Sequence, residues 1–104
     1  MKRQKPSIDN LLQSTQQAEK LLKLLANAKR LMILCHLLDG PKSVGELNSE
    51  IELTQSALSQ HLARMRTDGV VKTTKHGLYV HYHIAMPEIE AILAVLYDIY
   101  CKND

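Results

Sequence analysis

The chain has 104 residues, a formal net charge of +2, 45% hydrophobic residues and 23% charged residues. Because it contains four tyrosines but neither phenylalanine nor tryptophan, its core must consist of aliphatic side chains and methionine, which favours packed helices over an all-β sandwich. A chain of this length is expected to form one domain over residues 1–104, and most multi-part enzyme folds are too large for it.

The N-terminal segment does not have the pattern of a targeting sequence. Residues 1–7 form a basic arm that we expect to be flexible, and polar residues follow where a signal peptide needs an apolar run. The sequence also has no stretch of about 18 uncharged apolar residues. These features predict a cytoplasmic protein that does not enter a membrane. In that reducing compartment the two cysteines are not expected to form a structural disulfide.

Charge alternates along the chain. Residues 1–38 sum to +5, 39–53 to −3, 54–85 to +3 and 86–104 to −3. Nucleic-acid binding depends on a basic face rather than on net charge, so the near-neutral total does not exclude it. The alternative interpretation is that the basic residues only solvate helix surfaces.

Apolar residues at three- and four-residue spacing predict a long first helix over residues 8–25 and a second helix over 28–38. An asparagine separates the two helices, and Gly40-Pro41 has the pattern of a helix stop. Cys35 falls on the apolar stripe that we expect the second helix to bury.

The next helices are indicated by their N-terminal caps. Ser43-Val44-Gly45-Glu46 has the form of a capping box, with serine at the N-cap and glutamate three residues later, and predicts a short third helix. Thr54 can then cap a fourth helix.

From Val70 the pattern changes to β-branched residues, then a glycine-containing turn, then a strand of alternating apolar residues. Residues 70–84 are therefore expected to form a β-hairpin. Pro87 suits the first turn of a last helix over 87–101. That helix is apolar on most sides, which predicts packing against a second copy of the chain. The expected fold class is mainly α with a β-hairpin, in the order four helices, two strands and one helix.

Residues 43–67 have the pattern of a helix-turn-helix, which the hairpin over 70–84 follows as a wing. When residues 54–66 are projected at about 100° per residue, one side is apolar and carries Ala57, Leu58, His61, Leu62 and Met65. The other side is mostly polar and carries Gln55, Ser56, Ser59, Gln60, Ala63 and Arg66. Amide and hydroxyl groups can bond base edges and phosphates in a major groove, so the polar side is a candidate DNA-binding face.

The segment Leu53–Val71, with the sequence LTQSALSQHLARMRTDGVV, resembles the recognition-helix signature of ArsR/SmtB winged-helix repressors. The preceding residues Ser43–Leu47 fit the same family, and the resemblance covers nearly the whole chain. It implies a homodimer formed through the first and last helices. It also implies that the two recognition helices enter successive major grooves of a palindromic, double-stranded DNA operator.

Carried over position by position, the resemblance implies a set of residues that face DNA in the recognition helix: Gln55, Ser56, Ser59 and Gln60. Arg64 and Arg66 are weaker candidates for phosphate contact. In the wing, the residues implied to approach a minor groove or the phosphate backbone are Lys72, Lys75, His76 and Gly77. The alternative interpretation of the wing is an ordinary exposed hairpin.

The remaining histidines are not expected to bind DNA or metal. His61 falls on the apolar side of its helix, which is typical of a hydrogen-bonded core histidine. His81 and His83 project from the same strand face, and we expect them to be an incidental solvent-facing pair.

This sequence also lacks the residues that bind metal ions in the resembled family. Ser43 and Gly45 stand where one site has two cysteines. Glu88-Ile89-Glu90 stands where the other site needs an aspartate and a histidine, and no histidine follows up to Cys101. We expect neither a metal nor a cofactor.

Cys35 and Cys101 resemble the cysteine pair of the persulfide-sensing subgroup that includes BigR and SqrR, and of the related HlyU regulators. The resemblance implies that sulfane sulfur donors convert the two thiols of one subunit into a disulfide or polysulfide bridge, after which DNA affinity falls. An apolar stripe and a helix C-terminus both disfavour the reactive thiolate, an effect that Lys102 or His36 could offset. The alternative for Cys35 is a small buried hydrophobic residue.

The sequence thus predicts a DNA-binding transcriptional repressor that senses reactive sulfur species, namely persulfides and sulfane sulfur, through Cys35 and Cys101. Other interpretations stay open: an HlyU-like activator that displaces a silencing protein, a general thiol-redox sensor, a protein-interaction module, and, less favoured, a metal sensor. An enzyme is not expected, because no set of nucleophile, base and orienting residue can be assembled from the sequence.

Overall fold

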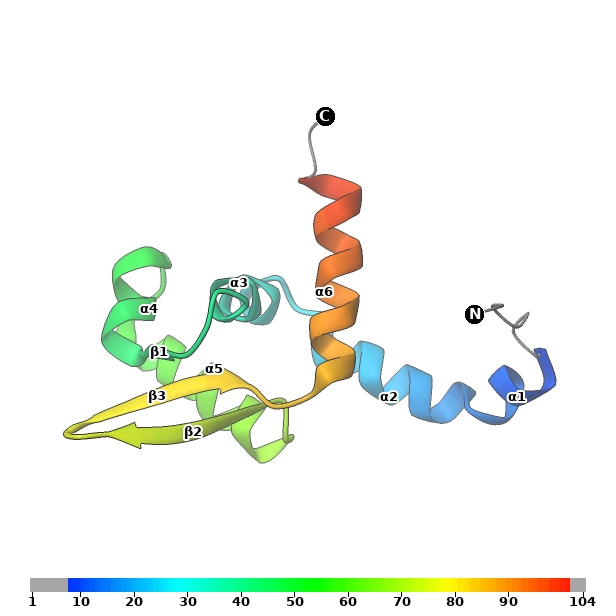
Figure 1. Ribbon diagram of the computed structural model, residues 1–104, viewed down its shortest axis with the longest axis horizontal. Coiled ribbons are helices and arrows are strands. Elements are labelled where there is room, and N and C mark those ends of the chain that lie inside the picture. The colour runs from blue at the N-terminus through cyan, green and yellow to red at the C-terminus, as the bar shows by residue number, and fades with distance from the viewer. Residues whose placement is uncertain (1–7, 102–104) are drawn as a thin grey trace, which may run out of the picture.

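The computed structural model describes residues 8–101, which form a winged helix-turn-helix (Figure 1). Its elements follow in the order α1 (Ile8–Gln13), α2 (Thr15–Leu25), α3 (Ala28–Leu37), β1 (Lys42–Ser43), α4 (Val44–Glu50), α5 (Gln55–Thr67), β2 (Val71–His76), β3 (Tyr79–Ile84) and α6 (Pro87–Tyr100). The expected fold class, mainly helical with a hairpin wing, is confirmed. The basic arm expected over residues 1–7 lies outside the described residues.

The single helix expected over residues 8–25 is instead two helices, α1 and α2, with a break at Ser14. The backbone N–H of Ser14 donates to the carbonyl of Leu11 at 2.9 Å, and Thr15 Oγ1 donates to the carbonyl of Leu12 at 3.1 Å. Short hydroxyl side chains compete with the helical ladder for backbone partners. This competition explains why the helix is interrupted although the apolar spacing continues through the break.

The helix-turn-helix is formed by α4 and α5, and both of their expected caps are confirmed. Ser43 Oγ accepts from the Glu46 N–H at 3.1 Å, while Glu46 Oε1 accepts from the Ser43 N–H at 2.9 Å. Thr54 Oγ1 accepts from the N–H of Ala57 at 3.1 Å and begins α5. In the turn between the helices, Asn48 Nδ2 donates to the carbonyl of Leu53 at 2.8 Å. These bonds fix the entry angle of the second helix.

The sheet has the order β1-β3-β2, and all its strand pairs are antiparallel. The two-residue strand β1 was not expected, because two residues are too few to show a periodicity. The hairpin closes through a two-residue loop between His76 and Tyr79, in which Gly77 has φ +63°. A positive φ at the first loop residue alone is typical of a type II′ turn, which suits the twist of a hairpin.

The hydrophobic core lies where α3, α5, the base of the hairpin and the first half of α6 meet. Its buried members are Leu25, Ile33, Leu34, Leu37, Leu47, Ile51, Leu58, Leu62, Met65, Val70, Val71, Ile89 and Leu93. Full burial of one such side chain contributes about 2 kcal/mol. The inner side of α5 is thereby held against the core, and its polar side is directed to solvent.

Two expectations about burial are wrong. Cys35 is exposed, and α3 instead buries Ile33, Leu34 and Leu37. The helix is apolar on more than one side, so spacing alone could not determine which side faces the core. His61 is half-buried rather than part of the core, because it lies at the edge of the apolar side of α5.

Apolar side chains remain exposed on the elements that project from the helix-turn-helix. Figure 1 shows α1 and α2 extending to one side and α6 rising away from the wing. On these helices Ile8 is 73% exposed, Leu22 57% and Ile99 62%. An apolar surface of this extent is typical of a contact with another chain. Within the described part of the protein, none of the helices combines the length and apolar character needed to cross a membrane.

Candidate functional site

The polar side of α5 is fully available to a ligand. Its residues Gln55, Ser56, Ser59, Gln60, Arg64 and Arg66 are all exposed. On the opposite side, Leu58, Leu62 and Met65 have no exposed surface. The expected division of this helix into an apolar and a polar side is confirmed. The resulting surface offers amides and hydroxyls over its first two turns and guanidinium groups near its end, a composition that suits base edges flanked by phosphates.

The wing carries three exposed cationic or titratable residues, Lys72, Lys75 and His76. Since successive side chains of a strand point to opposite faces, Lys72 and His76 share one face of the hairpin while Lys75 points to the other. The structure therefore does not bring the two lysines to one face. Lys75 and His76 lie at the hairpin tip, opposite Val80 and Tyr79.

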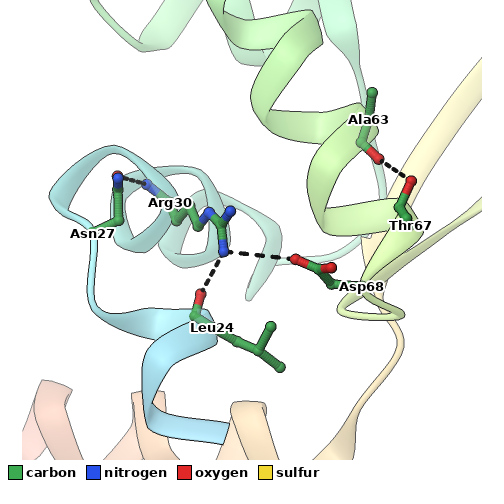
Figure 2. A network of polar contacts seen from close by, with 6 residues as sticks. All are labelled: Leu24, Asn27, Arg30, Ala63, Thr67 and Asp68. Atoms are coloured by element: carbon green, nitrogen blue, oxygen red, sulfur yellow. Dashed lines mark hydrogen bonds and ion pairs between the residues drawn. The ribbon is translucent and has the colours of Figure 1, made fainter. Parts of the chain in front are cut away.

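Arg30 joins the C-terminal end of α5 to the helices before it (Figure 2). Its Nη1 donates to the carbonyl of Leu24 at 3.3 Å and lies 3.9 Å from Oδ2 of Asp68, the residue that ends α5. The Arg30 side chain is 16% exposed. Asn27 accepts from the N–H groups of Lys29 and Arg30 and so caps α3 beside this contact. Sequence reasoning missed Arg30, because its partner is 38 positions away.

A second contact joins α3 to α4. His36 Nδ1 lies 2.9 Å from Glu50 Oε2 at the end of α4. His36 directly follows Cys35 in α3, so the helix that carries a thiol also holds the first helix of the helix-turn-helix. The sequence gave no signal for this pair either, since neither residue belongs to a motif.

Both thiols are free and open into one cavity of about 740 Å³ between α3 and α6. The structure thus brings Cys35 and Cys101 together, although 65 residues separate them in the sequence. Their neighbours in the cavity wall are Leu31, Leu38, Asp39, Leu93, Leu96, Tyr97 and Tyr100.

The surroundings of Cys35 favour its protonated form. Cys35 reaches solvent, yet the apolar side chains around it remove enough water to raise the pKa of its thiol, and the negative charge of Cys101 raises that pKa further. His36 does not offset this effect through the cavity, because its ring faces Glu50. Lys102, next to the second thiol, lies outside the described residues.

Two histidines of the wing, His76 and His81, contact other side chains. The rings of His76 and His81 have centroids 5.0 Å apart, and His81 Nε2 lies 3.8 Å from Glu46 Oε1. His81 and His83 are half-buried, so the expectation of a solvent-facing pair is wrong. β3 lies between β1 and β2, and this central position reduces their exposure. Within residues 8–101 no group of three or more potential ligands could hold a metal ion.

Comparison with known proteins shows similarity over nearly the whole chain. The family model described as "Bacterial regulatory protein, arsR family" matches residues 27–73. The transcriptional activator HlyU of Vibrio cholerae is 46% identical over 96 residues, which span 92% of this chain and 89% of HlyU.

Solved structures agree in fold. The structure of reduced HlyU from Vibrio cholerae matches with a TM-score of 0.81 and 46% identity, covering 91% of this chain and 100% of that chain. The crystal structure of the transcriptional repressor BigR from Xylella fastidiosa matches with a TM-score of 0.86 and 31% identity, covering 94% of this chain and 100% of that chain. Identity of this extent, on the same winged fold, establishes that the protein is a transcriptional regulator of the ArsR family.

Proposed function

We propose that the protein is a homodimeric repressor that releases operator DNA when reactive sulfur species join Cys35 and Cys101 within one subunit. The observation that carries this proposal is the common cavity into which both thiols open. One thiol is on α3, which contacts the helix-turn-helix through His36. The other thiol follows the last residue of α6, a helix whose C-terminal end exposes Ile99 and Tyr100.

The proposed chemistry needs no cofactor. The Cys101 thiolate attacks the outer sulfur of a persulfide R–S–SH, taking that sulfur as Cys101–S–SH and releasing the thiol RSH. The Cys35 thiolate then attacks the inner sulfur of Cys101, so that a Cys35–Cys101 disulfide forms and hydrosulfide leaves. Two thiols are oxidised by two electrons and the sulfane sulfur is reduced to sulfide. If both thiols first become persulfides, their condensation releases hydrogen sulfide and gives a trisulfide.

Binding of DNA is proposed to use the polar side of α5 in the major groove. Base edges and phosphates would be met by Gln55, Ser56, Ser59 and Gln60. The candidates for phosphate contact are Arg64, Arg66, Lys72, Lys75 and His76. Because Lys75 and His76 lie at the hairpin tip, whereas Lys72 lies near the base of the wing, we expect the two tip residues to contribute more than Lys72.

A dimer is supported by the exposed apolar residues of α1, α2 and α6. Two recognition helices must be about 34–36 Å apart to enter successive major grooves. A bridge between α3 and α6 would change the angle between the helix-turn-helix and the helix that contacts the second subunit. A small rotation there would move α5 by a larger distance, and the two recognition helices would no longer be spaced to fit successive major grooves.

The proposal is tested by intact mass and DNA affinity on the same samples. The reduced protein is treated in parallel with a persulfide, hydrogen peroxide or zinc, and fluorescence anisotropy reports binding to its operator. We expect persulfide alone to remove two hydrogen atoms, with or without added sulfur, and to lower DNA affinity. Cys35→Ser and Cys101→Ser should bind DNA normally and stay bound after treatment. A serine variant that still releases DNA would contradict the proposal, and bridging by peroxide would instead indicate a general thiol-redox sensor.

A second candidate function is activation of transcription, which the 46% identity to a transcriptional activator favours. In this case the same dimer would displace a silencing protein instead of excluding RNA polymerase. Deleting the gene distinguishes the two. Target transcripts rise on deletion if the protein is a repressor and fall if it is an activator.

A further inference from the structure

The cavity that holds the two thiols is much larger than an inorganic sulfur donor requires. Its volume of about 740 Å³ lies within the range of sites that bind organic small molecules. A hydropersulfide anion or a short inorganic polysulfide would leave most of this space empty. The volume therefore leaves room for a donor with an organic group attached to its sulfane sulfur.

The walls of the cavity determine which organic group fits. Four leucines, Leu31, Leu38, Leu93 and Leu96, and the rings of Tyr97 and Tyr100 surround the thiols. Asp39, an acidic side chain, is the charged residue among the described residues that line the cavity. An anionic donor would lose water on entering and would meet a carboxylate rather than a cation. An uncharged apolar group would gain contacts with the leucines.

From this lining we infer that the thiol cavity is a binding site for uncharged organic sulfane-sulfur compounds, such as short dialkyl trisulfides, and that Asp39 disfavours anionic carriers. The inference rests on the proposed function, because it concerns the donor that bridges the same two thiols. With a trisulfide R–S–S–S–R, the Cys101 thiolate attacks a terminal sulfur, forming Cys101–S–S–R and expelling the persulfide R–S–S⁻. The Cys35 thiolate then forms the Cys35–Cys101 disulfide and expels R–S⁻. Two protein thiols are oxidised, and one trisulfide becomes one persulfide and one thiol.

The test compares donors that differ only in their organic groups. The full-length protein is treated with dipropyl trisulfide or with glutathione trisulfide, which carries carboxylates, and bridge formation is followed by intact mass. Each rate is divided by the rate of the same donor with a short cysteine peptide, which has no cavity. If one donor buries about 60 Å² more apolar surface than the other, it is preferred by roughly tenfold. We therefore expect the normalised rate with dipropyl trisulfide to be about tenfold higher than that with glutathione trisulfide. Equal ratios, or a preference for glutathione trisulfide, would overturn the inference.

Two substitutions examine the walls, each with a matched control. Asp39→Asn should raise the rate with glutathione trisulfide about threefold at low salt and leave dipropyl trisulfide unchanged, while Glu19→Gln on α2, with the same charge change, should alter neither. Leu38→Gln should slow dipropyl trisulfide, whereas Leu78→Gln at the wing tip should not. If a variant and its control have the same rates, the substituted residue does not contribute to the choice of donor.

Sodium tetrasulfide, a small inorganic donor, separates this inference from the proposed function. If none of the donors produces a bridge, the proposed function itself is wrong. If tetrasulfide and both trisulfides bridge the thiols with equal normalised rates, the proposed function stands and the cavity does not select its donor.

Discussion

The Nδ1 atom of His36 lies 2.9 Å from Oε2 of Glu50, and this contact joins the helix that bears Cys35 to the first helix of the helix-turn-helix. The His36 side chain is 30% exposed and that of Glu50 is 53% exposed. A polar side-chain contact at such exposure stabilises the fold by less than about 1 kcal/mol. The contact matters because of where it lies. His36 directly follows Cys35, so a rotation of α3 at the thiol would also move α4 through Glu50.

We therefore expect His36→Gln to weaken regulation more than stability. The variant should bind the operator within about threefold of the parent when reduced, since the lost contact is worth less than about 1 kcal/mol. The ratio between its reduced and bridged DNA affinities should shrink. Anisotropy titrations of both states measure this ratio, and Glu52→Gln, which removes a nearby exposed charge, serves as control. A ratio equal to that of the parent would show that α3 and α4 are not coupled through this pair.

On the recognition helix, Gln60→Ala should weaken operator binding by about 1–3 kcal/mol and relax the base preference at one position. The reason is that a glutamine amide can form two hydrogen bonds with the edge of one base. Arg64→Ala should instead weaken binding to all sequences and reduce the salt slope by about one. Titrations against operator variants at several salt concentrations separate the two effects. Gln16→Ala on α2 should change neither quantity. An unchanged salt slope for Arg64→Ala would exclude that residue from phosphate contact.

Thiol reactivity should depend on pH in a direction set by the surroundings of Cys35. Burial and the charge of Cys101 both raise the pKa of Cys35. The thiolate fraction of Cys35, and with it the rate of alkylation, should therefore increase only at a pH higher than the pH at which an ordinary cysteine ionises. Replacing Cys101 by serine removes the repulsion but not the burial. The midpoint should therefore fall while staying above the ordinary value. Iodoacetamide rates at Cys35, followed by peptide mass, test this, and a midpoint that rises in Cys101→Ser would contradict the assigned cause.

The capping box of α4 should make the protein sensitive to acid. The hydrogen bond from the Ser43 backbone N–H is the main cause that lowers the pKa of Glu46. Burial opposes it, and the Ser43 side chain, His81 and Lys42 lower the pKa further. A carboxyl whose pKa falls on folding stabilises the native state above its unfolded pKa, and that stabilisation is lost as pH falls through the folded pKa. Glu46→Gln should flatten this acid dependence. Urea unfolding between neutral and acidic pH measures it, with Glu90→Gln on α6 as control, and equal slopes for both variants would refute the prediction.

The tip of α6 is expected to form the subunit contact. Ile99→Glu places a charge on a residue that is 62% exposed in the single chain, so the fold of each subunit should survive while the dimer dissociates. Loss of the second half-site contact should reduce operator affinity by about a hundredfold or more. Sedimentation measures the oligomeric state, and Glu90→Gln again serves as control. A variant that remains dimeric with full DNA affinity would place the interface elsewhere.

Sequence patterns alone anticipated the elements whose signals are local. The caps at Ser43 and Thr54, the stop at Gly40, the hairpin around Gly77 and the polar side of α5 each depend on residues within a few positions of one another. Local hydrogen bonds and side-chain periodicity are properties of short segments, so the sequence determines them before the chain is packed. The break at Ser14 is the exception, because apolar spacing carried no information on the competing hydroxyl of Thr15.

Tertiary structure decided everything that depends on which apolar side of a helix is buried. α3 has apolar residues on more than one side, and only its packing into the common core showed that Ile33, Leu34 and Leu37 are inside while Cys35 faces outward. The same packing brought Cys35 beside Cys101, His36 to Glu50 and Arg30 to Asp68. The sequence by itself therefore determined that this protein has a winged helix-turn-helix with a polar recognition face. The folded chain decided that its two thiols line one cavity, because the proximity of distant residues depends on how helices pack, and periodicity within one helix does not contain that information.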